Sequence, residues 1–458
     1  MSNLLTSLSS AANSMNAYEQ AMEVVQNDTV NANTAGFVSQ SVNFAALPFD
    51  VNGAQSGGVE VAGVISSRDE YAETNVQIQQ TAANYSSTLS SVLSNVQPVF
   101  DLQNTTGIAG SLNTLFSAFS SLSTTPNDAT ARETVITDAS SVASAFSTAA
   151  TGLATAASSV NTDTQNTVTD INNTLADIAN LNTQISTGSQ STPDPSVDAR
   201  MYSDLETLSQ YVGITTQTGQ DGSINVYLAG QRPLVVGSNA FSLSANETSS
   251  GTVIQDSNGN DITSFVKGGT LGALVQVQNT TLPGYESQLN QLAQGVADTI
   301  NTQLAAGVDQ NGNAGAPLFS YTAGNPSQIL TVTNITGSEI AAASSANPGG
   351  NDNALALAAL QNNSVSTLGN TTITNYFGNL SALVGRDVSN AQNTNTTDQS
   401  LLAQAQSLRS QASGVSLDEE AAKLEQYQQS YDATSKLISA IDDMTTTLMD
   451  LMPAPSSL

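Results

Sequence analysis

Apolar residues recur every three or four positions through the first 25 residues of the chain. This spacing is the a/d pattern of a coiled-coil helix, and mostly Ser, Asn, Gln and Ala lie between, so the apolar stripe is narrow. Such a helix cannot bury its stripe alone and must pack on its own domain or on a partner helix. The predicted interface residues of this N-terminal helix are Leu4, Leu8, Ala11, Met15, Tyr18, Met22 and Val25.

The other end of the chain carries a second helical stripe. It begins at Ser416–Glu419 (SLDE), which has the form of a capping box, because the Ser side chain can accept from a backbone amide while the Glu reaches back. Two narrow-striped helices at opposite ends predict that the helices pack on each other and on neighbouring copies. The predicted interface residues of the C-terminal helix are Leu417, Ala421, Leu424, Tyr427, Tyr431, Ile438, Ile441 and Leu448.

Between the two ends the periodicity changes twice. Apolar spacing is helical up to about residue 185, alternates with period two from 212 to about 267, and is helical again from 285. The sequence predicts a mainly α fold with a β-rich module, in an elongated multi-domain chain whose terminal coiled-coil helices pair. The expected parts are 1–36 and 414–458 for the terminal helices, 37–200 and 285–413 for a long helical bundle, and 201–284 for an outer antiparallel β module.

Composition excludes several classes of function. Only 10% of residues are charged, and 38 acidic against 9 basic residues give a net charge of −29. Nucleic acid and anionic membrane surfaces both need clustered Lys and Arg, so neither is an expected partner. Cysteine and histidine are absent, which excludes thiol nucleophiles, Cys/His zinc sites and the Ser-His-Asp triad. No basic region resembling a secretory signal opens the chain, since its first basic residue is Arg68.

The remaining candidates for chemistry are weak. A loop from Asp309 has the oxygen ligands of a calcium site, but its sixth and twelfth positions are Ala314 and Ser320 instead of Gly and Glu, which predicts a plain turn. Arg200 has an acid, Asp204, four residues later, which predicts a structural ion pair. Adjacent acids lie in or beside helical patterns, as expected of solvated faces. The sequence therefore predicts no catalytic residue, no metal site, no cofactor and no enzyme.

An asparagine-rich segment, Asn27–Phe37, follows the N-terminal stripe. It resembles the N-x-x-x-N-x-N-T-x-G-[YF] segment of bacterial flagellar axial proteins, which share paired terminal helices. Ala35, Phe37 and Val38 depart from the usual Pro, Tyr and polar residue. The positions that match the motif are Asn27, Asn31, Asn33, Thr34, Gly36 and Phe37.

Within that superfamily, segments along most of the chain resemble the hook-associated protein 1 family, which forms the hook–filament junction. They are Ser413–Glu420, Tyr427–Tyr431, Gly269–Val277 with Leu282–Tyr285, Val308–Gly315 and Asn351–Leu360.

The resemblance implies a secreted structural component of the bacterial flagellum that assembles as a ring through its terminal helices. It also implies type III export, hook protein and hook-associated protein 3 as partners, and an export chaperone on the C-terminal helix. A hook or rod axial protein is the alternative within this class. An extracellular glycan-acting or adhesive protein is the alternative outside it.

Overall fold

The computed structural model describes residues 2–50, 55–187, 194–248 and 251–450. Residues 451–458, the end of the expected C-terminal segment, lie outside this description. The chain divides into two compact units: unit 1 comprises Met1–Thr81, Ile171–Ser242 and Gln399–Leu458, and unit 2 comprises Ala82–Asp170 and Leu243–Asp398. Unit 2 is thus inserted twice into the sequence of unit 1.

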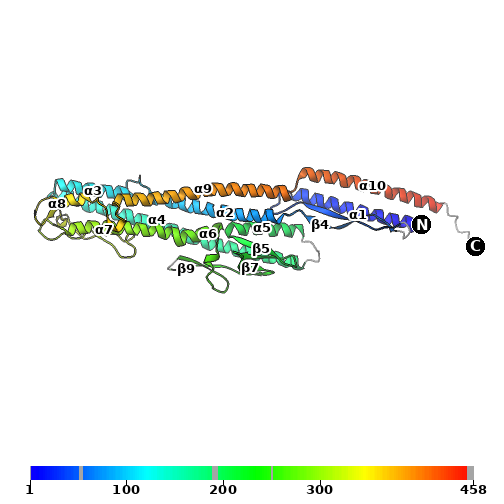
Figure 1. Ribbon diagram of the computed structural model, residues 1–458, viewed down its shortest axis with the longest axis horizontal. Helices are drawn as coiled ribbons and strands as arrows, with labels where there is room; N and C mark the ends of the chain where they lie inside the picture. The colour runs from blue at the N-terminus through cyan, green and yellow to red at the C-terminus, as the bar shows by residue number, and fades with distance from the viewer. Residues whose placement is uncertain (1, 51–54, 188–193, 249–250, 451–458) are drawn as a thin grey trace, which may run out of the picture. The chain divides into compact units, whose positions relative to one another are not determined.

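The terminal helices lie in unit 1 and pack on each other, as the two stripes predicted. Helix α1 (Ser2–Asn31) runs antiparallel to α10 (Leu417–Asp450), and neither helix contains Gly or Pro (Figure 1). The side chain of Ser416 caps α10 by accepting from the backbone amide of Glu419 at 3.4 Å.

Residues after α1 form strands that the helical periodicity did not predict. Strands β1 (Gln40–Ala46) and β4 (Val59–Ser66) pair antiparallel and pack along α1, with β2 (Phe49–Asp50) and β3 (Gln55–Ser56) extending the hairpin. The sequence pattern concealed them because their faces are only partly buried and show no clean alternation.

The rest of unit 1 is a helix followed by a small sheet. Helix α5 (Pro195–Tyr211) leads into strands β5 (Ile214–Thr218), β6 (Ile224–Leu228), β7 (Arg232–Val236) and β8 (Asn239–Ala240), paired antiparallel in chain order. Asn182 of α4 (Ala129–Thr187) hydrogen-bonds this sheet to the helix. Its side chain donates to the carbonyls of Ile224 and Gly237 and accepts from the Ile224 amide.

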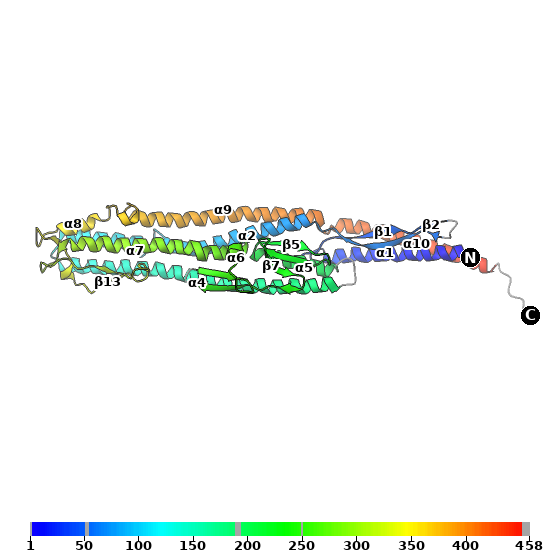
Figure 2. The ribbon, with the colours of Figure 1, turned by 60° about the horizontal axis from the view of Figure 1, so that its bottom comes forward.

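Unit 2 is a helical bundle around one core. Parts of α2 (Glu70–Val96), α4 and α9 (Ile373–Ser413) lie along α7 (Leu282–Ala305), while α8 (Asp352–Ala359) packs on α3 (Ile108–Thr124) and on α7 (Figure 2). The largest fully buried side chains in this core include six aromatic rings: Phe100, Phe116, Phe119, Phe146, Phe319 and Phe377.

A second β hairpin belongs to unit 2. Strands β9 (Ser244–Thr248) and β10 (Gly251–Gln255) pair antiparallel, followed by α6 (Gly269–Gln276) and one π turn, η3 (Val277–Thr281). In that turn Asn279 accepts from the amide of Thr252 and donates to its carbonyl, so its side chain continues the hairpin's hydrogen bonding.

Short elements complete unit 2. They are η1 (Gln97–Phe100), η2 (Thr263–Phe265), η4 (Gly337–Glu339), η5 (Ser366–Leu368) and the strand pairs β11 (Gly307–Val308) with β14 (Ala343–Ser344) and β12 (Phe319–Ser320) with β13 (Thr331–Val332).

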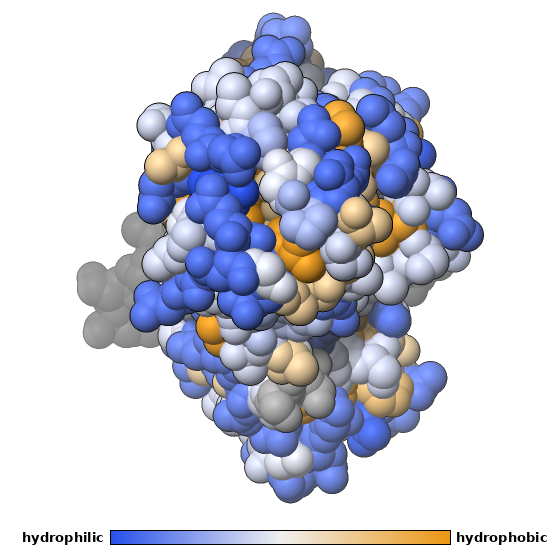
Figure 3. Space-filling view, turned by 90° about the vertical axis from the view of Figure 1, so that its left-hand side faces the viewer, coloured by the Kyte–Doolittle hydropathy of each residue, from blue (hydrophilic) through white to orange (hydrophobic). Residues whose placement is uncertain are grey.

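The predicted class, mainly α with small antiparallel sheets, is confirmed. Within 201–284, however, strands occupy only the middle, because α5 fills its beginning and α6, η3 and the start of α7 fill its end. None of the described helices has a window long and apolar enough for a membrane span. At the α3 and α8 end of unit 2 the visible surface is mostly polar, with apolar side chains in scattered spots (Figure 3).

Candidate functional site

The face that α1 buries is rotated from the stripe that its sequence predicted. Of the predicted residues, Ala11 and Val25 are buried, whereas Leu4, Leu8, Met15, Tyr18 and Met22 are half-buried. The most enclosed positions include Ala17, Ala21 and Asp28, which the apolar pattern did not select. Small side chains let neighbouring segments approach closely, so two alanines four residues apart are the signal that could have revealed this face.

Only part of the predicted stripe of α10 packs against the rest of unit 1. Ile441 is buried, Leu424, Tyr427, Tyr431 and Ile438 are half-buried, and Leu417, Ala421 and Leu448 are exposed. Phe44 of β1 lies between Tyr18 and Tyr427, with ring centroids 5.8 and 5.9 Å away. Aromatic rings at this spacing attract one another beyond simple burial, so they hold the hairpin and both helices together.

An apolar ridge remains uncovered on the described part of α10. We define it as Leu437, Met444 and Leu448, whose exposed fractions are 53%, 53% and 42%. These positions are seven and four residues apart, so they lie on one side of the helix. The exposed Leu5 and Val30 add apolar surface to α1.

The asparagine-rich segment forms the end of α1 and a tight turn. Asn31 donates to the carbonyl of Asn27 and accepts from the Thr34 hydroxyl, and the Phe37 amide closes the turn on the Thr34 carbonyl. Asn27, Asn33 and Thr34 are exposed, while Asn31, Gly36 and Phe37 are half-buried.

Gly36 explains why this turn needs glycine. Its φ is +73°, a region that other residues rarely adopt, and a Cβ at this position would lie 2.1 Å from the carbonyl oxygen of Ala199 in α5. The turn therefore packs its backbone directly on α5.

Beside the turn lies an unbroken chain of five charged side chains, here called the charge chain. Arg68 bonds Glu73 at 2.5 Å and Asp198 at 2.7 Å, and Arg409 bonds the other oxygen of Glu73 at 3.1 Å and Glu206 at 2.7 Å. The side chains of Arg68 and Glu73 are only 6% and 5% exposed. Arg68 lies just before α2, and the other groups come from the first turn of α2, from α5 and from the end of α9, so the charge chain joins segments that are far apart in the sequence.

Arg68 also holds the turn. Its guanidinium donates to the Gly36 carbonyl at 2.7 Å and lies 3.8 Å from the ring centroid of Tyr202, a cation–π contact. Burial raises the pKa of Tyr202 to about 12, so its ring stays neutral.

The predicted pair of Arg200 and Asp204 is wrong. Arg200 is exposed and donates to the carbonyl of Ser196 at 3.2 Å, one helical turn back. Burial and the charge of Asp177 raise the pKa of Asp204 to about 6, although Arg200 opposes them. A four-residue spacing allows contact but does not compel it, because exposed side chains gain little from pairing.

A second charged cluster lies between the terminal helices. Asp28 of α1 and Glu420 of α10 are 0% and 1% exposed. Glu420 accepts from Lys423 at 2.7 Å, and Asp28 accepts from the backbone amide of Gln40 at 2.6 Å. The apolar pattern did not predict this cluster, because Asp28 lies off the apolar stripe.

The structure assigns the remaining candidates to structural roles. In the Asp309 loop one carboxylate oxygen accepts from the amides of Asn311 and Asn313, each at 2.8 Å, which is the turn that the sequence predicted. Among the described residues, no three or more acidic side chains are grouped so that they could hold a metal ion.

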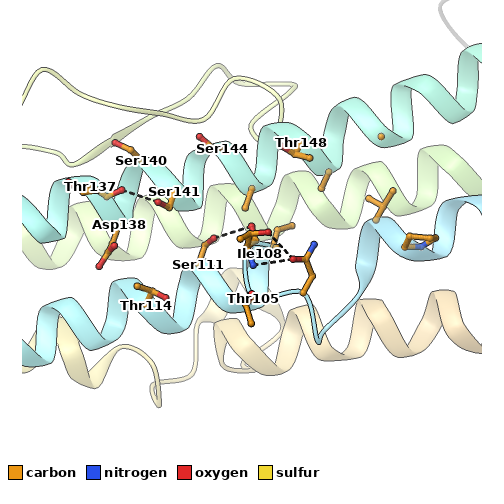
Figure 4. A pocket seen from close by; sticks show the side chains of 18 residues that line it. Thr105, Ile108, Ser111, Thr114, Thr137, Asp138, Ser140, Ser141, Ser144 and Thr148 are labelled. Atoms are coloured by element: carbon orange, nitrogen blue, oxygen red, sulfur yellow. Dashed lines mark hydrogen bonds between the residues drawn. The ribbon is translucent and has the colours of Figure 1, made fainter.

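A groove of about 860 Å³ in unit 2 runs between α3 and α4, and hydroxyl groups of Ser and Thr line it together with apolar side chains (Figure 4). Asp138 is its one carboxyl, and burial raises its pKa. Glycoside hydrolysis needs two carboxyls, so this lining does not supply that chemistry.

Two models of known families match the chain. The model described as the helical domain of flagellar hook-associated protein FlgK matches residues 93–319. The model described as the C-terminal part of flagellar basal body rod FlgEFG proteins matches residues 406–451, which include all of α10.

Relatives with one shared description match over most of the chain. Flagellar hook-associated protein 1 of Bacillus subtilis (strain 168) is 23% identical over 497 positions, covering 97% of this chain and 97% of that protein. The protein of that description from Salmonella typhimurium (strain LT2) is 26% identical over 68% of this chain and 58% of its own length. The one from Escherichia coli (strain K12) is 24% identical over 71% and 62%. The chain thus spans less than two thirds of the latter two relatives.

A solved structure shares the fold. The flagellar hook junction protein FlgK from Burkholderia pseudomallei matches with a TM-score of 0.68 at 17% identity, covering 75% of this chain and all of that one.

Proposed function

We propose that the chain belongs to the family of flagellar hook-associated protein 1 and is a structural subunit of the hook–filament junction, where copies associate into a ring through their terminal helices. In this proposal residues 1–36 and 414–458 form the assembling part. Residues 37–200 with 285–413 form the helical bundle domain, and 201–284 form the outer β module. The chain has no catalytic role and acts by occupying its place in the bacterial flagellum.

The observation that carries the proposal is the uncovered ridge of α10 beside its contact with α1. Within one copy, α1 covers one side of α10 and leaves Leu437, Met444 and Leu448 in solvent. An apolar surface of this kind is typical of an interaction site.

The proposal gives α10 two successive partners. Before export, a chaperone covers the exposed apolar residues of α10, and after assembly a neighbouring copy covers them. The hook protein and hook-associated protein 3 then contact the two sides of the ring. A helix with a narrow stripe is marginal in isolation, so these complexes are expected to stabilise the pairing of the terminal helices.

Loss of the protein tests its place in the flagellum. A strain lacking the gene is expected to show bare hooks of normal length in the electron microscope and to shed flagellin into the medium. Expression of the full chain should restore filaments. Intact filaments without the gene would contradict the proposal.

The match of residues 406–451 to rod proteins favours one second candidate, a hook or rod axial subunit. Those proteins would share the terminal helices but have a different place in the flagellum. The deletion strain separates the two, because loss of a hook or rod subunit removes the hook itself.

Removal of the ridge is expected to block assembly without unfolding the chain. Leu437 and Met444 are more than half exposed, so the double change Leu437→Ser and Met444→Ser should alter stability by less than about 1 kcal/mol. If a neighbour buries the exposed half of both side chains, their loss costs about 1.5–3 kcal/mol in total at the interface and weakens association at least tenfold. The measurement is filament number in the deletion strain carrying the variant.

Leu355→Ser is the matched control, because Leu355 is 52% exposed on α8 in unit 2. It should restore filaments as well as the unaltered chain does. Equal restoration by the ridge variant, at equal protein level, would show that another surface drives assembly.

A further inference from the structure

Two buried carboxyl oxygens between the terminal helices have no partner. Asp28 uses Oδ2 to accept from the Gln40 amide, and Glu420 uses Oε1 to accept from Lys423. The other oxygens, Oδ1 of Asp28 and Oε2 of Glu420, are enclosed and lack any hydrogen-bond partner among the described residues. A buried acceptor without a donor costs about 1–3 kcal/mol, and more when it is charged.

The charges at this place do not balance. Two ionised carboxylates face a single ammonium, which leaves one negative charge in an enclosed site. A buried charge is tolerated only when it is paired, and otherwise the group takes up a proton. One proton would remove the excess charge and convert an unpartnered acceptor into a donor.

We propose that the joint of α1 and α10 binds one proton, held on Asp28 beside Glu420, and that loss of this proton loosens the pairing of the terminal helices. The proposal rests on the function proposed above, because copies are proposed to assemble through this helix pair and the pH would set how tightly the two helices pair. It predicts that the pair is tight in mildly acidic solution and weaker above neutrality.

The electrostatics of the neighbouring elements agree with this assignment. The pKa of Asp28 is raised to about 6, chiefly by burial and also by the charge of Glu420, while the Gln40 amide and Lys423 oppose the shift. Helix α10 supplies Glu420, Lys423 and, acting on Lys423, Tyr427, whereas β1 supplies only the uncharged amide of Gln40.

The sign of the effect follows from linkage. The pKa of Asp28 is raised by helix pairing, so pairing is favoured where Asp28 is protonated. This stabilisation is fully present below the ordinary value of 3.8 and is lost as the pH rises through about 6. Between pH 5 and pH 8 the pairing equilibrium should weaken about tenfold.

Hydrogen–deuterium exchange of the full chain measures the pairing directly. After correction for the intrinsic rate at each pH, protection of residues 420–441 is expected to fall about tenfold between pH 5 and pH 8, with a midpoint near 6. Asp28→Asn keeps the shape and the acceptor for Gln40 but cannot ionise, so its protection should stay at the acid level throughout.

Asp204→Asn is the matched control, since Asp204 also has its pKa raised to about 6 but lies on α5. It should leave the pH profile of residues 420–441 unchanged. A change equal to that of Asp28→Asn would overturn the proposal, because the pH dependence would then be global.

Two further variants separate proton binding from a merely structural role. Lys423→Met removes the compensating charge and should move the midpoint to higher pH, whereas Glu420→Gln removes repulsion and should move it to lower pH. Protection that changes equally at every pH, without a shift of midpoint, would overturn the proposal. So would a flat profile, no protection at any pH, or protection restored at pH 8 by Ca²⁺, which would identify a metal ion as the occupant. These measurements need no flagellum, so failure here leaves the deletion experiment on the proposed function to be judged separately.

Discussion

Gly36→Ala is expected to lower the free energy of unfolding by about 3 kcal/mol. The left-handed backbone at Gly36 costs an L residue about 1–2 kcal/mol, and the added methyl group overlaps the Ala199 carbonyl, which costs about 1–3 kcal/mol as overpacking. A flexible side chain could move aside, but the obstacle is the backbone of α5. Urea unfolding followed by far-UV circular dichroism measures the loss.

Gly237→Ala separates the two causes. Gly237 has a φ of +55°, but nothing lies within 4 Å of the position of its added Cβ. It should therefore show only the conformational cost of about 1–2 kcal/mol. Equal losses at the two glycines would mean that the contact of the turn with α5 contributes nothing.

Arg68→Met is expected to cost about 3–5 kcal/mol, the usual result of removing one partner from a buried ion pair. The change leaves the nearly buried Glu73 with one cation instead of two and removes the donors to Asp198 and to the Gly36 carbonyl. Arg68→Lys should recover only part of this loss, because an ammonium cannot reproduce the forked geometry of the guanidinium. The measurement is again urea unfolding of the full chain.

Arg200→Met is the control for Arg68→Met. Arg200 is exposed and its side chain donates to one carbonyl of its own helix, so the change should stay within about 0.5 kcal/mol. Adding Glu73→Gln to Arg68→Met should restore part of the lost stability, since it removes charge left without its partner. A double variant with additive losses would show that Arg68 acts through packing alone.

The sequence predicted those features that local spacing encodes. The two terminal stripes predicted both helices and their pairing, and the Gln220–Gly222 segment predicted the hairpin of β5 and β6. The spacing of apolar residues alone could not predict which face of α1 is buried. Ala17 and Ala21 are buried because they are small, and they contribute little to an apolar pattern.

The charge chain was hidden for a different reason. Arg409 and Glu73 lie 336 residues apart, so no local spacing connects them, whereas Arg200 and Asp204 had a suitable spacing and do not pair. Burial decides which charges associate, and burial depends on tertiary packing. The unpartnered oxygens of Asp28 and Glu420 likewise arise only once α1 and α10 lie together.

The same 336-residue separation sets the order in which the molecule can be completed. Closing so large a loop is slow, because many residues must be ordered before the contact forms. Because the chain is synthesised from its N-terminus, the ion pair of Glu73 and Arg409 cannot form until almost all of the sequence has been made. The Gly36 turn can contact Arg68 early, but the full set of ion pairs, which joins the segments around α2, α5 and α9, forms only at the end.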